Sequence, residues 1–203
     1  MTFWFRRFSV LGLLALAALF TNHGFAAQEQ PSAEYDYLLL ATSKTSTMQN
    51  EMEEAAESGY VFVGVMGGDT ALGGSEVVVV MERRPGAAAP QFEYRLLATS
   101  KTSTMQNELQ EAGDAGFSFR GQTVFGSRFG GDEPVVILER GLDMASPELF
   151  EYRLLATKKT STMVKELREA GAVGFRFVGV TVSSTRFGGD EIVAILKRPV
   201  VDR

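Results

Sequence analysis

The sequence Lys-Thr-Ser-Thr-Met occurs three times, and this repetition constrains the fold more than any other feature of the chain. The copies begin at Lys44, Lys101 and Lys159, which are 57 and then 58 residues apart. A fixed period of this length indicates tandem copies of one supersecondary unit. We therefore divide the chain into three repeats, which are residues 34–84, 91–140 and 149–199.

Each repeat has the pattern of a strand, a helix and two further strands. In the second repeat, residues 92–98 alternate apolar and polar side chains, which is the period of a half-buried strand. Met105, Leu109 and Ala112 then recur at helical spacing. Gly116 stands where a left-handed cap would end the helix. Two more short apolar segments follow and predict a β-hairpin.

These connections predict an α+β fold of three tandem β-α-β-β repeats. A helix between the first two strands leaves them parallel, whereas the second and third strands form an antiparallel hairpin. If the third strand lies between the other two, every pairing is antiparallel and one helix covers one face of the sheet. The predicted strand order is therefore 2-3-1.

The repeats are expected to pack on one another. A unit of ~50 residues is marginal by itself. The second sheet face of the third repeat also carries the apolar side chains Leu155, Val178, Val180 and Val182. We expect these faces to be buried between repeats, with the helices outside. A pseudo-threefold cluster, one continuous sheet and a homo-oligomer all satisfy this requirement.

Residues 1–26 are predicted to be a secretory signal peptide. Arg6 and Arg7 precede an apolar run, and small residues favour cleavage between Ala26 and Ala27. The apolar run is short for a membrane span. The residues around the arginine pair match a twin-arginine signal poorly, which favours the general secretory route. We expect a periplasmic or secreted protein with no stable membrane span after cleavage.

Composition excludes several kinds of function. The only Trp and the only His, Trp4 and His23, lie in the predicted signal, and the chain has no Cys. The remaining chain carries 18 Lys and Arg against 25 Asp and Glu, a net charge of −7, which argues against nucleic-acid binding. Cysteine nucleophiles, zinc–thiolate sites and histidine bases are excluded. We predict no enzymatic activity and no cofactor.

We also predict no metal site. One glutamate recurs near the start of the third strand of each repeat, but no loop has the dense Asp and Asn spacing of a calcium site. The three residues are Glu76, Glu133 and Glu191.

The repeated Lys-Thr-Ser-Thr segment has two interpretations. In the first it is a helix start, in which Ser46 with Gln49 and Ser103 with Gln106 form capping boxes and the methionine packs beneath the helix. The third repeat has Val164 in place of the glutamine. In the second interpretation the free amides and the lysine bind a small anion. The candidate residues are Lys44, Thr45, Ser46, Thr47, Lys101, Thr102, Ser103, Thr104, Lys159, Thr160, Ser161 and Thr162.

Three other features recur. The turn before the third strand places an arginine and an aspartate around a glycine pair, as secondary site candidates for an ion pair or a rim contact: Arg128 with Asp132, and Arg186 with Asp190. A tyrosine in the first strand is expected in the core: Tyr37, Tyr94 and Tyr152. A glycine in the second strand indicates a bulge or a close approach by another element such as the helix: Gly64, Gly121 and Gly179.

Short motifs at fixed places in each repeat carry a family resemblance. The second repeat has Phe92-Glu93-Tyr94, Gly116-Phe117 and Glu139-Arg140, and the third has the same pattern with Lys197-Arg198 at its end. The pattern resembles a small bacterial family of unknown function, whose members are single strand-helix-strand-strand domains. The resemblance covers all three repeats and implies a fold but no activity.

The sequence therefore favours an exported, non-enzymatic interaction protein whose partner is an unknown envelope protein. The alternative is a small anionic-ligand binder that uses the three helix starts.

Overall fold

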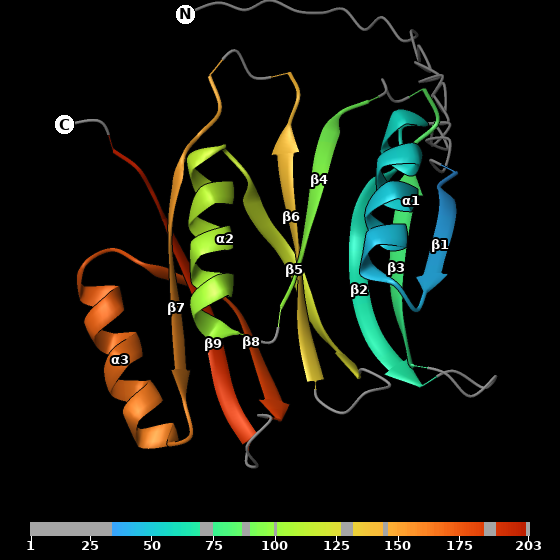
Figure 1. Ribbon diagram of the computed structural model, residues 1–203. Helices are drawn as coiled ribbons and strands as arrows, with labels where there is room; N and C mark the ends of the chain where they lie inside the picture. The colour runs from blue at the N-terminus through green and yellow to red at the C-terminus, as the bar shows by residue number, and fades with distance from the viewer. Residues whose placement is uncertain are drawn as a thin grey trace, which may run out of the picture. The chain divides into compact units, whose positions relative to one another are not determined.

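The computed structural model describes residues 34–69, 75–86, 90–99, 101–126, 132–143, 146–184 and 190–201. They belong to one compact unit, Ala33–Arg203 (Figure 1). The predicted signal peptide, residues 1–26, lies outside the described residues.

Each repeat contains the predicted strand, helix, strand and strand. The first repeat comprises β1 (Asp36–Thr42), α1 (Thr45–Glu57), β2 (Val61–Asp69) and β3 (Ser75–Arg83). The second comprises β4 (Phe92–Ala98), α2 (Thr102–Asp114), β5 (Ser118–Gly126) and β6 (Asp132–Gly141). The third comprises β7 (Phe150–Thr157), α3 (Thr160–Ala172), β8 (Arg176–Ser184) and β9 (Asp190–Pro199).

The strands form three separate antiparallel sheets. Their orders are β1-β3-β2, β4-β6-β5 and β7-β9-β8, so the third strand of each repeat lies in the centre. This confirms the predicted order 2-3-1. It also excludes one continuous sheet as the way in which the repeats combine.

Glycine ends each helix in the same way. Gly59, Gly116 and Gly174 have φ angles of 86°, 84° and 88°. The amide of Phe117 donates to the carbonyl of Ala112 over 2.9 Å, and the other two repeats make the same bond. This is the Schellman closure, which suits glycine because it has no Cβ atom. The predicted cap is confirmed, and it directs the chain into the second strand.

An arginine at the end of each sheet's central strand joins three short motifs of its repeat, which in the second repeat are Phe92-Glu93-Tyr94, Gly116-Phe117 and Glu139-Arg140. The Arg140 guanidinium donates to the Ala115 carbonyl at the end of α2 over 3.0 Å and pairs with Glu93. It also lies over the Phe117 ring, 4.7 Å from the ring centroid. Arg83 and Arg198 make the corresponding contacts in their repeats. These motif residues therefore hold helix, sheet and turn together.

The sheets stack face to face, and the first two helices lie at the junctions between repeats. Helix α1 packs both on its own sheet and along β4, and α2 packs in the same way along β7. We expected the helices outside, which is wrong for α1 and α2. Each is needed to cover the first strand of the following repeat as well as its own sheet. Among the described residues, helix α3 packs on β7, β8 and β9 of its own repeat.

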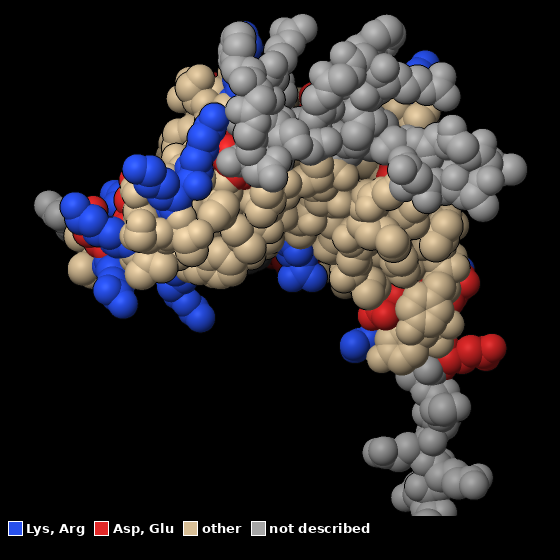
Figure 2. Space-filling view, turned by 90° about the horizontal axis from the view of Figure 1, so that it is seen from below, with Lys and Arg blue, Asp and Glu red and all other residues tan. Residues whose placement is uncertain are grey.

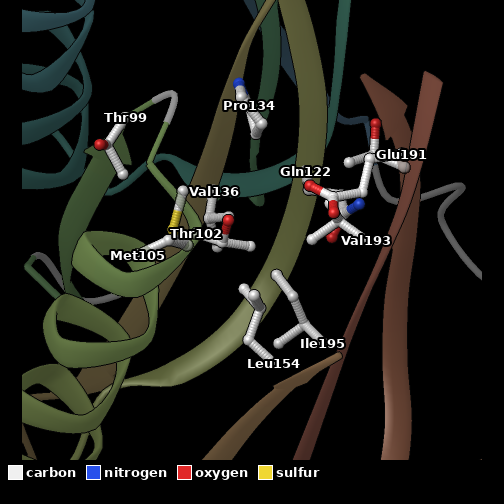
Figure 3. Close-up of a pocket in the computed structure, with 11 residues that line it drawn as sticks. Thr99, Thr102, Met105, Gln122, Pro134, Val136, Leu154, Glu191, Val193 and Ile195 are labelled. Carbon is white, nitrogen blue, oxygen red and sulfur yellow. The ribbon is translucent and has the colours of Figure 1, made fainter. Parts of the chain in front are cut away.

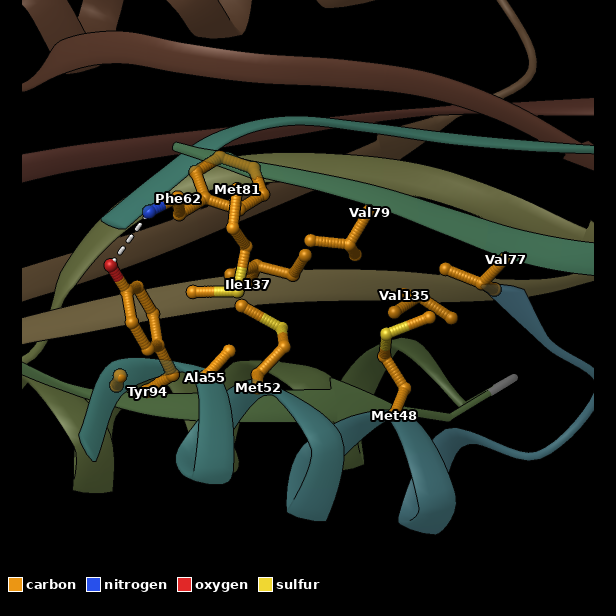
Figure 4. Packing of buried hydrophobic residues seen from close by; sticks show 11 residues of the cluster. Met48, Met52, Ala55, Phe62, Val77, Val79, Met81, Tyr94, Val135 and Ile137 are labelled. Atoms are coloured by element: carbon orange, nitrogen blue, oxygen red, sulfur yellow. Dashed lines mark hydrogen bonds between the residues drawn. The ribbon is translucent and has the colours of Figure 1, made fainter. Parts of the chain in front are cut away.

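The first core shows how the repeats share their apolar side chains. Met48 and Met52 project from α1 between the two sheets, where Val135 and Ile137 of the second repeat meet them (Figure 4). Tyr94 reaches back from β4, and its hydroxyl accepts a hydrogen bond of 2.8 Å from the Phe62 amide. The second core has the same construction, whereas the third consists of third-repeat residues alone.

The recurring glycine of the second strand marks both a bulge and a close approach. The register shifts between Phe119 and Gly121 in β5, and at the same place in β2 and β8. A Cβ atom at Gly121 would stand 3.0 Å from the Phe62 ring, and one at Gly179 would stand 2.6 Å from the Phe119 ring. The approaching element is the second strand of the preceding repeat, not the helix that we suggested.

Candidate functional site

The Lys-Thr-Ser-Thr segments begin the three helices, as the first interpretation predicts, but not through a capping box. Helix α1 begins at Thr45 with Lys44 as its N-cap, and this N-cap makes no side-chain capping hydrogen bond. The other two helices begin in the same way at Thr102 and Thr160. The lysine amide instead donates to a threonine hydroxyl two residues earlier, as between Lys44 and Thr42 over 3.2 Å. The methionines are buried beneath the helices as predicted.

The glutamines assigned to the capping boxes have another partner. Gln49 donates to the Tyr94 carbonyl over 2.8 Å and accepts from the Leu96 amide over 2.7 Å. Gln106 makes the same pair of bonds to the carbonyl of Tyr152 and the amide of Leu154, over 3.0 and 2.7 Å. The capping-box prediction is therefore wrong. Each glutamine side chain bonds to a carbonyl and an amide of an edge strand in the following repeat. These two backbone groups would otherwise lack partners.

The structure offers little support for an anion at the helix starts. The three lysines are exposed. At α2, Thr102 and Ser103 line an open groove of about 390 Å³ that also contains the acidic side chain of Glu166. A carboxyl group there opposes an anionic ligand. The anion site stays a prediction, and thermal shifts with phosphate and sulfate test it if the wild type is compared with an alanine variant of Lys44, Lys101 and Lys159.

The secondary candidates in the turns are not tested. Arg128 and Arg186 lie outside the described residues. Asp132 and Asp190 begin β6 and β9, opposite Gly126 and Ser184, but their side chains are outside the described part.

A small cavity lies between the second and third repeats (Figure 3). Its volume of about 30 Å³ suits a single water molecule. Gln122 lines it, and neither polar atom of that side chain has a hydrogen-bond partner among the described residues. The first and third repeats have Val65 and Val180 at the position of Gln122. The cavity is too small for an organic ligand, so we regard it as a packing feature.

A larger open groove of about 640 Å³ lies between the first and second repeats and contains charged side chains from both. Within it the Arg120 Nε atom is 3.4 Å from a carboxylate oxygen of Glu139. Burial raises the pKa of Glu139 above its ordinary value, against the opposing effects of Arg120 and of a hydrogen bond with Tyr94. Burial also raises the pKa of Tyr94. We therefore regard Arg120 and Glu139 as an ion pair at the junction between the first two repeats.

The strongest candidate surfaces are the two ends of the stack. We call the outer face of the first sheet the first face. We call the part of the third sheet that α3 leaves open, on the side where α3 packs, together with the adjoining side of α3, the last face. The first face comprises Tyr37, Leu39, Gly64, Met66, Val78 and Val80. The last face comprises Val164, Arg168, Gly171, Phe177, Val180 and Val182.

Both faces expose apolar residues whose counterparts are buried at the junctions between repeats. Tyr37 is 61% exposed, whereas Tyr94 and Tyr152 are 1% and 4% exposed. Tyr37 was expected in the core with the other two, and that prediction is wrong because, among the described residues, no other repeat packs on the outer face of the first sheet. At the other end, Phe177 is 54% exposed, whereas Phe62 is 4% exposed. A contiguous exposed apolar face of this kind indicates a binding surface.

Sequence reasoning found part of the last face, because Val180 and Val182 belong to the apolar set that we expected to be buried between repeats. That expectation is wrong for these two residues, which are 51% and 56% exposed. Sequence reasoning missed the first face, although one signal that the end repeats differ was present. The third repeat has Val164 at the position where the first two repeats have Gln49 and Gln106. A residue needed only where another repeat follows is free to differ in the last copy.

Among the described residues, no helix is long and apolar enough to cross a membrane. In the same part of the chain, no cluster of three or more His, Cys, Asp or Glu side chains is placed to hold a metal ion. Comparison with protein-family models, curated proteins and solved structures finds no match to this chain.

Proposed function

We propose that this protein is an exported, non-enzymatic interaction module that binds a protein partner through the end faces of its stack of sheets. The observation that carries the proposal is the exposure of Tyr37 and Phe177, whose counterparts Tyr94 and Phe62 are buried at the repeat junctions. Export is inferred from the predicted signal, residues 1–26, and places the protein in the periplasm or outside the cell.

Several features of the two faces support binding rather than catalysis. Leu39 and Met66 on the first face are 64% and 63% exposed, with Val78 and Val80 beside them. These side chains are large and apolar, and they lie on paired strands that fix their positions. Such a face suits an apolar protein surface. It contains no pair of groups placed for proton transfer or nucleophilic attack.

Affinity capture from an envelope extract tests the proposal. The bait is the chain from Ala27, which contains the whole compact unit Ala33–Arg203. Its matched variants are Phe177→Glu and Leu39→Glu, one for each face. The control is Leu142→Glu, because Leu142 is 47% exposed and lies in the linker outside both faces.

We expect defined proteins to be retained by the wild type and by Leu142→Glu, and to be lost with at least one end-face variant. Identical retention by all four baits would contradict the proposal. The proposal would also be contradicted if no protein, including further copies of this chain, were retained from extracts of several growth conditions.

A further inference from the structure

We propose that the partner of these end faces is a second copy of this chain, bound head to tail, so that the last face of one copy covers the first face of the next. This inference rests on the proposed function and specifies its partner. The chain itself contains the same type of interface twice, between repeats 1 and 2 and between repeats 2 and 3. The two end faces are the unmatched halves of that interface.

The first argument is steric, and it begins with a ring and a glycine. Within the chain, the Phe62 ring lies against Gly121 and the Phe119 ring lies against Gly179. At the ends, a Cβ atom at Gly64 would meet nothing within 4 Å, and the Phe177 ring is exposed. The first face thus keeps the vacant glycine, and the last face keeps the ring that would fill it.

A helix glycine and a first-strand tyrosine form a second pair of complementary positions. Gly113 of α2 lies beneath the following repeat, where a Cβ atom would be 2.2 Å from the Phe150 carbonyl oxygen and 2.9 Å from the Tyr152 ring. The corresponding Gly171 of α3 has nothing within 4 Å of such an atom. The tyrosine that would occupy this space is Tyr37 of the next copy, whose ring is exposed.

The second argument is electrostatic. The first repeat carries 3 Lys and Arg against 9 Asp and Glu, the second 5 against 7, and the third 9 against 5. The net charges are therefore −6, −2 and +4 along the stack. On one side of the molecule, Figure 2 shows basic side chains gathered toward the third repeat and acidic ones toward the first. Opposite charges meet when copies associate head to tail, whereas like charges meet when two first faces or two last faces pair.

A specific charge pair follows from the repeat relationship. Lys197 in β9 contacts the hydroxyl of Ser118 in the preceding repeat. The counterpart of Lys197 in the first repeat is Glu82, and the counterpart of Ser118 in the third repeat is Arg176, as the strand registers show. Glu82 of one copy would therefore face Arg176 of another.

The proposed contact between copies differs from the junctions inside the chain in one respect that affects its strength. The glutamines that pair with the edge strand of the next repeat are replaced in α3, because Val164 stands at the position of Gln106 and Arg168 at that of Gln110. The contact between copies lacks these amide bonds and should be weaker than the junctions inside the chain. We therefore expect association that depends on protein concentration. Val164→Gln should lower its dissociation constant, and we expect a decrease of about fivefold for one restored pair of hydrogen bonds.

The test is sedimentation velocity of the chain from Ala27 over a range of concentrations, with two variants that each block one face. Gly64→Val fills the vacancy on the first face, and Phe177→Glu places a charge on the last face. We expect each variant alone to remain monomeric, with its dissociation constant raised at least about tenfold. An equimolar mixture should form a 1:1 dimer and nothing larger, because one intact first face and one intact last face remain. Leu142→Glu should assemble like the wild type.

A charge exchange provides the second test. Glu82→Arg and Arg176→Glu should each weaken association, and the double variant should restore it because opposite charges again meet. Head-to-tail binding is overturned if the wild type stays monomeric at every concentration. It is also overturned if the mixture of blocked variants does not dimerise, or if Phe177→Glu assembles normally, as a two-fold dimer of first faces would. If these results coincide with retained envelope proteins in the capture experiment, the proposed function stands and only the identity of the partner is wrong.

Discussion

The Phe62 ring lies against Gly121 so closely that a Cβ atom at residue 121 would stand 3.0 Å from the ring. The Val65 side chain is nearly as close, at 3.1 Å. The spacing between the first and second sheets therefore depends on the absence of a side chain at Gly121. Gly64 occupies the same place in β2, but a Cβ atom there would meet nothing within 4 Å.

Valine at these two glycines should have different consequences for stability. Gly121→Val must displace Phe62 and Val65, and overpacking of this kind costs about 1–3 kcal/mol. Gly64→Val meets no neighbour and should change the free energy of unfolding by less than about 0.5 kcal/mol. Urea denaturation of both variants measures the difference, and strand propensity cancels because both changes are made at the same strand position. Equal stabilities would show that the sheets are not packed through this contact.

Gln122→Val should stabilise the protein. The buried amide of Gln122 has no hydrogen-bond partner among the described residues, and an unsatisfied buried polar group costs about 1–3 kcal/mol. The other two repeats already have valine at this position, as Val65 and Val180. We expect a gain of about 1 kcal/mol in the free energy of unfolding, measured by urea denaturation. A loss of stability would indicate that a water molecule in the adjoining cavity satisfies the amide.

Gln106→Val should have the opposite effect, although the substitution is chemically the same. Gln106 bonds to both the Tyr152 carbonyl and the Leu154 amide. Its loss leaves both backbone groups of β7 without a partner, and we expect a cost of about 1–3 kcal/mol. A neutral result would mean that solvent reaches this edge of β7. Gln122→Val measured under the same conditions is the matched control.

Arg140 should contribute more to stability than an exposed ion pair does. Its guanidinium contacts the end of α2, Glu93 and the Phe117 ring, so Arg140→Ala should cost about 1–2 kcal/mol. Lys165, which is 77% exposed, pairs with Glu169 on the surface of α3, so Lys165→Ala should change stability by less than about 0.5 kcal/mol. Thermal unfolding of the two variants makes the comparison. A loss at Lys165 as large as that at Arg140 would contradict this account.

Glu139 should oppose folding at neutral pH. Burial raises its pKa above the ordinary value of 4.5, so the folded state holds this proton more tightly than the unfolded state. The contribution of Glu139 to stability is therefore most favourable below pH 4.5 and is lost as pH rises through the folded-state pKa. Glu139→Gln removes the ionisation and should be more stable than the wild type at pH 7 but not at pH 4. A difference between variant and wild type that is the same at both pH values, in urea denaturation, would contradict the assignment.

Local structure was predictable because it depends on residues close together in the chain. Apolar spacing predicted the helices, Gly116 predicted the end of α2, and the short connections allowed one reasonable strand order. The fit between repeats was not predictable in the same way. Gln49 and Gln106 have the spacing of a capping box within their own helices, and nothing local indicates that their amides bond to strands more than forty residues away.

The sequence by itself determined the three α+β repeats, their internal strand order and the absence of cysteine and histidine chemistry from residues 27–203. The tertiary structure decided that the sheets stack with helices at their junctions, and that Tyr37 and Phe177 are exposed while Tyr94 and Phe62 are buried. The physical reason is that identical side chains in tandem repeats acquire different environments only from their neighbours. Among the described residues, the first and last copies are each covered by a neighbouring repeat on one side alone, and their other sides are the two faces available for binding.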